Sequence, residues 1–487
     1  MIALHQSPSL PRIILFILLP AILLLWGLSF ILPAPKGKVV VVALDSFSPR
    51  EVRTLVARGK MPNFRWLIEH GYWNRLETDE SSLSRVVWPI IETGRPPAIN
   101  GITGTGKTHI TYQVDNMRQV PSLWEIVTLA RQTAAVWNAY ESYPAYKING
   151  IFMSDRWLND VLGRNTEGIY HPYALGHAIA DRVSWGWKNP PWQNYSTYIT
   201  DGQGWNAEFT TNVGFADYFA KKSMALRVEF GGIAPLAARL SGDYDLTYYY
   251  NNTTDNFTHI LLEGGAAGQS RFEALYTMCD AILGVFLDNL GPNDHLMVIS
   301  DHGFNPIPAG EDNSIVVKRE AARSYDELLG ELYRNREQAA TISNVLEEPE
   351  GWRIAFKSSA NPLLLRRFLT RLDLLYGEGM VDVRLEHAHT GSGISGTIAV
   401  YGPGVAKNSD ASEKPHILNI TPTILYLLNI PVGSDMEGGV AQSLFTEGWL
   451  RSHPIKTIAT WGTRHAAQNS TVSSEHLAEM KTLGYIQ

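Results

Sequence analysis

Residues able to bind a metal ion follow two apolar segments of the chain. Asp301 and His302 directly follow the apolar run Leu296–Ser300 and precede a glycine, which lets the backbone turn away. Asp45 follows a second apolar run, Val39–Leu44. Such runs suit strands of a sheet buried on both faces, whose functional groups sit beyond the carboxyl ends of the strands. We therefore expect Asp45 and Asp301 to meet, and carboxylate and imidazole groups together suit a divalent ion.

A further pair of metal-binding side chains is Asp255 and His259. At this spacing both side chains share one face of a helix or tight turn and can bind one ion together. Alone, the pair fits a solvated helix face better than a metal site, whereas Asp301 and His302 alone fit a polar turn and a metal site equally well.

The segment Ser84–Ile102 contains a motif that helps to interpret these possible ligands. Ser84 precedes an apolar stretch with Trp88, followed by the step Thr93–Gly94, a proline-containing turn and a closing Gly-Ile. In these features the sequence resembles the type I phosphodiesterase and nucleotide pyrophosphatase branch of the alkaline phosphatase superfamily. The resemblance implies that Ser84 is the nucleophile.

Other blocks along the chain support the resemblance by their order and spacing. Ser300–Phe304 matches the Ser-Asp-His-Gly-Phe signature of the family. The remaining blocks that resemble those of family members are Leu44–Ser46, Met61–Phe64, Ser142–Arg156, Tyr250–His259, Gly396–Val405, Ile420–Leu425, Asp435–Gly438 and Leu483–Tyr485.

The resemblance also implies two sets of metal ligands. The first ion is held by Asp45, Ser84, Asp301 and His302, and the second by Asp255, His259 and a late histidine. His389 is our choice for the late histidine, and His387 is the alternative. The sequence departs from the family pattern at Arg85, where many members carry proline, and at Asn100, where relatives often carry histidine.

The implied cofactors are two divalent metal ions. Carboxylate and imidazole ligands suit Zn²⁺, and Mn²⁺ or iron fits the same ligands. Coordination of a serine hydroxyl stabilises its alkoxide, and a second ion can stabilise the leaving oxygen at phosphorus. The sequence therefore predicts a metal-dependent phosphodiesterase or phosphatase that acts on phosphate esters through a phosphoserine intermediate.

Three alternatives use the same residues differently. A phosphoethanolamine or phosphoglycerol transferase would pass the group to another acceptor, and a non-catalytic metal-binding scaffold would keep the fold and an ion. A sulfatase is disfavoured because the sequence around Ser84 lacks the Cys/Ser-x-Pro/Ala-x-Arg setting.

Composition narrows the choice of partners. The chain has 487 residues and a formal net charge of −7, and it lacks a basic stripe, which disfavours a protein that coats nucleic acid. The single cysteine, Cys279, cannot form an internal disulfide.

The amino-terminal residues predict a membrane attachment. Residues 13–32 are uncharged and mostly apolar, which is long enough to span a bilayer as one helix. We expect residues 1–35 to form a single-pass signal anchor, with the catalytic domain outside the cytoplasm, in the periplasm or at the cell surface. A cleaved signal peptide is the alternative. The short link to Val39 suits a substrate linked to a lipid or glycan of that surface.

Residues 36–487 are expected to form one catalytic domain. The resemblance implies an α/β fold, an alkaline phosphatase-like α/β/α sandwich with a mostly parallel central sheet. Residues of about 157–240 are rich in Trp, Tyr, Gly and Asn and predict an inserted cap region, and a second insertion is expected at about 305–383.

Overall fold

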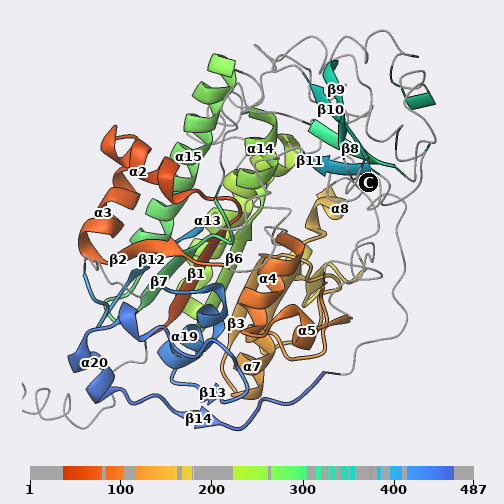
Figure 1. The fold of residues 1–487 in the computed structure, drawn as a ribbon. Helices are drawn as coiled ribbons and strands as arrows, with labels where there is room; N and C mark the ends of the chain where they lie inside the picture. The colour runs from red at the N-terminus through yellow and green to blue at the C-terminus, as the bar shows by residue number, and fades with distance from the viewer. Residues whose placement is uncertain are drawn as a thin grey trace, which may run out of the picture.

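The computed structural model shows a central eight-stranded sheet with helices on both faces (Figure 1). It describes residues 37–78, 84–103, 117–161, 167–177, 223–261, 265–303, 314–319, 342–348, 351–356, 381–384, 395–407 and 414–464, with a few isolated positions. In the order in which they pair, the strands are β2 (Tyr72–Leu76), β12 (Gly396–Tyr401), β7 (His295–Ile299), β1 (Val39–Leu44), β6 (Leu246–Asn251), β3 (Ala134–Ala139), β4 (Gly150–Ser154) and β5 (Tyr170–His171).

The central sheet is mostly parallel. Strand β1 pairs in parallel with β6 and β7, and β3 pairs in parallel with β6 and β4. Strand β12 runs antiparallel to β2 and β7, and the edge strand β5 runs antiparallel to β4. The predicted mostly parallel α/β sheet is therefore confirmed.

Two hydrophobic cores cover the two faces of the sheet. Val40, Val42 and Leu44 of β1 face one core, whereas Val39 and Val41 face the other, as the period of two in a strand requires. The helices that pack in the first core are α2 (Pro49–Ala57), α3 (Pro62–His70), α13 (Ala234–Leu240) and α15 (Gly265–Asp288). The helices in the second are α4 (Ser84–Thr93), α7 (Leu123–Leu129) and α19 (Ile420–Leu427).

Several shorter elements connect the strands and helices of the three layers. Helix α14 (Thr253–Leu261) follows β6 directly and contacts α15. The other short elements are α5 (Pro97–Asn100), α8 (Trp157–Val161), the π-helix η2 (Glu229–Ile233), the 3-10 helices η3 (Ser241–Asp243), η5 (Ile417–Asn419) and η6 (Gln442–Leu444), α20 (Glu447–Ser452), and the strand pair β13 (Val432–Gly433) and β14 (Thr457–Ile458).

Parts of the two predicted insertions are described. Strand β5 and helix α13, both within 157–240, belong to the central sheet and its first core. Between residues 305 and 384 lies a separate antiparallel sheet, in the order β11 (Val381–Arg384), β8 (Ser314–Lys318), β10 (Gly351–Phe356) and β9 (Ile342–Glu348). The cap and the domain boundaries stay predictions.

The predicted anchor, residues 13–32, lies outside the described residues. Among the helices that the structure does describe, none has both the length and the hydropathy to cross a membrane.

Candidate active site

Asp45 lies immediately beyond the carboxyl end of β1 and is almost fully buried. Its Oδ1 accepts a hydrogen bond from Oγ of Ser84 at 3.1 Å, and its Oδ2 accepts one from Nε1 of Trp88 at 3.0 Å. The hydroxyl of Tyr250 also donates to Oδ2. Three donors, two from helix α4 and one from strand β6, therefore fix the orientation of this carboxylate.

Ser84 is the first described residue of helix α4 and is also buried. Its Oγ lies 3.3 Å from Nε2 of His302, in addition to its bond with Asp45. The apolar residues of α4 pack in the second core, which holds the helix against the sheet: Val86, Val87, Trp88, Ile90 and Ile91. The structure thus places the predicted nucleophile between a carboxylate and an imidazole.

Asp301 and His302 follow β7, which pairs with β1, so they reach the same edge of the sheet as Asp45. Nε2 of His302 lies 3.2 Å from Oδ2 of Asp301 and 3.7 Å from Oδ1 of Asp45. Nδ1 of His302 lies 2.9 Å from the carbonyl oxygen of Gly303. A carbonyl only accepts, so Nδ1 donates to Gly303, and Nε2 faces the carboxylates of the site.

Asp255 enters the site from the first turn of α14. Ser46 links it to the other residues, because its Oγ donates to Oδ1 of Asp255 at 2.6 Å and its backbone N–H donates to Oδ1 of Asp301 at 3.2 Å. Ser46 adopts a left-handed conformation with a φ of 56°. This uncommon conformation for a residue other than glycine turns the chain after β1 so that one residue contacts both carboxylates.

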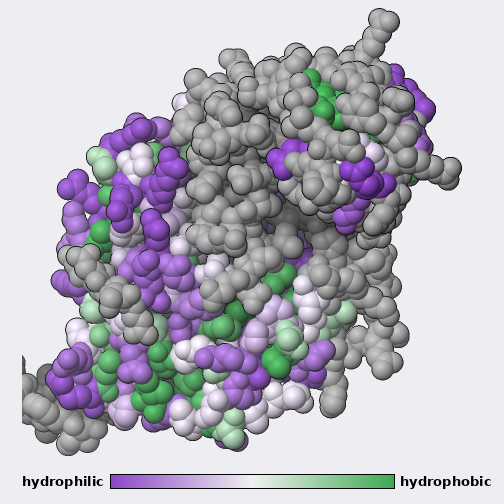
Figure 2. Space-filling model, viewed as in Figure 1, coloured by the Kyte–Doolittle hydropathy of each residue, from purple (hydrophilic) through white to green (hydrophobic). Residues whose placement is uncertain are grey.

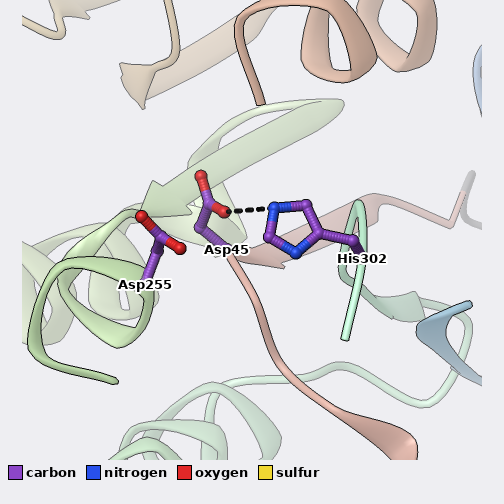
Figure 3. Close-up of side chains that lie close together, drawn as sticks. All are labelled: Asp45, Asp255 and His302. Atoms are coloured by element: carbon purple, nitrogen blue, oxygen red, sulfur yellow. Dashed lines mark ion pairs between the residues drawn. The ribbon is translucent and has the colours of Figure 1, made fainter. Parts of the chain in front are cut away.

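Asp45, Asp255 and His302 offer ligand atoms that lie within 4.8 Å of one another. Figure 3 shows Asp45 between the other two, with its ion pair to His302 drawn. Burial raises the pKa of Asp45 well above its usual value, and the charges of Asp301 and Asp255 raise it further. Burial also raises the pKa of Asp301.

This arrangement fits a divalent cation. Buried Oδ2 of Asp301 accepts no hydrogen bond among the described residues. Three buried carboxylates beside one imidazole carry more negative charge than the described site neutralises, and a bound cation would remove the imbalance. Oxygen and imidazole nitrogen are ligands that Zn²⁺, Mn²⁺ and iron accept.

The side chains of two predicted ligands, His259 and His389, lie outside the described part of the structure. His259 lies in α14, one turn after Asp255, so the expected helical spacing is present, but its side chain is outside the described part. His389 and the alternative His387 both lie outside the described residues. The predicted site residues that the structure brings together are Asp45, Ser84, Asp255, Asp301 and His302.

The two departures from the family pattern have structural partners. Arg85, next to Ser84, forms a buried ion pair with Glu141, whose carboxylate also lies near Arg156. Asn100 donates from Nδ2 to the carbonyl of Arg95 and accepts from the N–H of Ile102, which closes the turn around it.

Residues that the sequence did not reveal complete the site. Tyr250 and Ser46 were visible only as parts of family-like blocks, and Glu141 was not singled out. Tyr250 and Asp45 are 205 positions apart in the chain, and Arg85 and Glu141 are 56 apart. No local signal identifies such contacts, because they depend on how elements distant in the sequence pack together.

Comparison with known proteins agrees with the motif blocks. A model of the type I phosphodiesterase / nucleotide pyrophosphatase family matches residues 39–347, well over half of the 487 residues. This match confirms the resemblance inferred from the sequence. Among curated proteins, none matches the chain.

Several solved structures are similar to this one. A mutant of alkaline phosphatase PafA is 17% identical, with 85% of this chain and 100% of that chain covered and a TM-score of 0.47. Phosphonoacetate hydrolase from Sinorhizobium meliloti is 15% identical, with 82% and 96% covered and a TM-score of 0.44. Murine ectonucleotide pyrophosphatase / phosphodiesterase 5 is 11% identical, with 84% and 100% covered and a TM-score of 0.39.

Proposed function

Because the chain belongs to the type I phosphodiesterase / nucleotide pyrophosphatase family, a family of phosphoester hydrolases, we propose that it cleaves phosphate esters through a covalent intermediate on Ser84. The observation that carries this proposal is the position of the Ser84 hydroxyl. It lies 3.1 Å from Asp45 and 3.3 Å from His302, at the sheet edge where Asp255 and Asp301 also converge.

The proposed reaction has two displacements at phosphorus. Oγ of Ser84 attacks the phosphorus atom, the bond from phosphorus to the leaving oxygen breaks, and a phosphoserine forms. Water then attacks the same phosphorus atom, the bond to Oγ breaks, and the serine hydroxyl is restored. Asp45 and His302 hold Oγ in one place for both steps, and Tyr250 and Trp88 hold Asp45.

The reaction also requires positive charge beside the phosphoryl group. The acids near Ser84 would bind metal cations that supply this charge. Asp45, Ser84, Asp301 and His302 would hold one divalent ion, and Asp255 with His259 and His389 would hold a second. Two such ions, when bound, lower the pKa of the serine hydroxyl and stabilise charge on the attacking and leaving oxygens. Zn²⁺ is our first choice, with Mn²⁺ or iron as alternatives.

The transferase and scaffold alternatives differ from the hydrolase in testable ways. A transferase forms the same intermediate on Ser84 but passes the group to an acceptor other than water. A scaffold binds the ions without turnover. Release of product from a chromogenic ester with water as the sole acceptor supports the hydrolase and counts against both alternatives.

We also propose that residues 1–35 anchor the protein as a single-pass signal anchor and that residues 36–487 form an extracytoplasmic catalytic domain. The apolar segment 13–32 supports this arrangement. The proposed substrate is a phosphate ester linked to a lipid or a glycan of that surface, or a soluble one.

The proposal is tested by Ser84→Ala in the purified full-length protein. Hydrolysis of p-nitrophenyl phosphate and of its bis-ester should fall by about 1,000-fold or more, because the nucleophile is lost. Metal content should stay near that of the wild type, because the other ligands remain. Ser241→Ala is the matched control, since Ser241 is also buried but lies at the opposite edge of the sheet. Full activity of Ser84→Ala would refute the assignment.

A further inference from the structure

We propose that the protein acts on phosphate esters that reach it through water, and that it does not act on phospholipids of the membrane that anchors it. This inference rests on the proposed function, and it selects one substrate class among those that function allows. The observation behind it is that the described chain enters strand β1 at Val39, whereas the candidate active site lies beyond the opposite end of that strand.

Strand polarity fixes the direction in which the site faces. Residues 13–32 precede β1, so the chain enters the sheet at Val39, at the amino edge. Asp45 follows the last residue of β1, and Asp255 and Asp301 follow the parallel strands β6 and β7. Six residues at about 3.3 Å each separate the two edges by roughly 20 Å.

The chain is held firmly where it enters the domain. The N–H of Lys38 donates to Oδ1 of Asp294 at 2.9 Å, and the carbonyl of Lys38 accepts from the N–H of His295 at 2.8 Å. Gly37 approaches the backbone of Asn293 so closely that a Cβ there would overlap the Asn293 carbonyl oxygen. From Gly37 onward the chain therefore belongs to the domain and does not act as a tether.

The remaining tether is short. Only the four residues Pro33–Lys36 separate the apolar segment from Gly37, and two of them are proline. Fully extended, they span at most about 14 Å, at about 3.6 Å per residue. To turn the carboxyl edge toward the bilayer, the tether would have to run back along β1, roughly 20 Å, so it is too short.

Some large apolar side chains are exposed near the amino edge of the sheet. Leu129, at the end of α7, is 58% exposed, and Ile458 of β14 is 40% exposed. Trp66, at 37%, packs against Tyr401 at the amino-edge end of β12. Figure 2 shows hydrophobic residues among hydrophilic ones on the surface over α19 and α20.

This geometry determines which esters can reach Ser84. The phosphate of a phospholipid lies at the surface of its own bilayer and cannot rise by roughly 20 Å without extracting its acyl chains. A dissolved phosphate ester, or a phosphate carried on a long polar chain, reaches the carboxyl edge freely. The short tether, which by itself suggested a lipid-linked substrate, therefore indicates the opposite once the strand direction is known.

The orientation can be measured independently of activity. Ser270 and Asp288 are exposed residues near the two ends of α15, 18 residues or about 27 Å apart. Ser270→Cys and Asp288→Cys would each be labelled with a fluorophore in full-length protein in vesicles with a nitroxide on the lipid headgroups. The natural Cys279 is buried and is protected from the reagent. Strong quenching at 288 and weak quenching at 270 is the expected result, and equal or reversed quenching would overturn the proposal. Failure of the protein to remain with the vesicles would also overturn it.

The substrate class is tested with a matched pair of chromogenic esters. One is the p-nitrophenyl ester of a long-chain phosphatidic acid in the same vesicles, and the other is its water-soluble dibutanoyl analogue. We expect the soluble analogue to be cleaved at least about tenfold faster, as the barrier to leaving the bilayer requires. A 30-residue Gly/Ser insertion between Lys36 and Gly37 should remove the difference, because such a tether is long and flexible.

Equal rates on both esters with the native tether would contradict the inference while leaving the hydrolase intact. Absence of turnover on either ester, with the expected quenching pattern, would contradict the proposed function and leave the orientation established.

Discussion

Strand β6 carries three consecutive tyrosines, and the last two, Tyr249 and Tyr250, each form a hydrogen bond with a buried carboxyl group on their own face of the sheet. Tyr250 donates to Asp45 in the candidate site. Tyr249 is hydrogen-bonded to Glu229 of the π-helix η2, on the opposite face. Burial raises the pKa of both carboxyl groups, that of Glu229 to about 8. Shifted pKa values of this kind often mark functional residues.

The two carboxyl groups differ in their neighbours. Asp45 lies beside the hydroxyl of Ser84, the imidazole of His302 and further carboxylates. Glu229 lies in a core that includes Phe230, and its Oε1 has no hydrogen-bond partner among the described residues. A buried carboxyl group with a raised pKa is therefore insufficient to define a site. Convergence of several possible ligands on one point is what distinguishes Asp45.

The comparison is most directly tested by removing each carboxylate without changing its shape. Asp45→Asn should lower hydrolysis by about 100-fold or more, because it weakens the metal site and the hold on Ser84. Glu229→Gln should stay within about twofold of the wild type. The rate of hydrolysis of the soluble bis-ester is measured for each variant and the wild type, and circular dichroism confirms that the variants fold. A large loss in Glu229→Gln would show that the opposite face also contributes to catalysis.

Metal content provides the next test, and it concerns the ligands that the structure does not place. Asp255→Ala and His389→Ala should each lower the bound metal from about two ions per chain toward one, with a matching loss of turnover. His387→Ala should keep both ions. Elemental analysis of purified variants gives the count. If His387→Ala loses the ion and His389→Ala keeps it, the assignment of the late histidine is wrong by two residues.

The strands and the acids that end them could be predicted from the sequence. Val39–Leu44 and the run before Asp301 are apolar and β-branched, and in a parallel sheet this pattern alone places their following residues at one edge. The helical spacing of Asp255 and His259 was likewise visible. These features depend on local periodicity, which a single sequence displays.

The supporting contacts could not be predicted, because they depend on strand register. Ala43 pairs with Tyr250, and this pairing places the tyrosine hydroxyl beside Asp45. A shift of one residue would move Tyr250 to the opposite face and Tyr249 to the site. In the same way, the two contacts of Ser46 depend on its own left-handed conformation. Neither the register nor that conformation has a signal in the local sequence.

A smaller effect is expected from the tyrosines themselves. Tyr250→Phe should lower activity by roughly tenfold, because Asp45 loses one of the donors that orient it. Tyr249→Phe should leave activity nearly unchanged and lower the free energy of unfolding by about 1 kcal/mol. Steady-state rates and urea denaturation of the same two preparations separate these outcomes. Equal losses of activity would mean that the strand as a whole, rather than the bond to Asp45, governs the rate.

The smallest effect on activity, and the clearest on stability, is expected from the titration of Glu229. Its pKa is raised by burial from 4.5 to about 8, so the folded protein binds this proton more tightly than the unfolded chain does. The stabilising contribution is therefore complete below about pH 4.5 and is lost as the pH rises through 8, with a slope of at most about 1.4 kcal/mol per pH unit. Glu229→Gln cannot titrate, so between pH 5 and 8 its free energy of unfolding should fall less steeply than that of the wild type. Urea midpoints at several pH values measure the difference, and Glu69→Gln, at an exposed position, should follow the wild type. Parallel curves for Glu229→Gln and the wild type would show that Glu229 is ionised in the folded protein. Glu229 would then lack the raised pKa that it shares with Asp45.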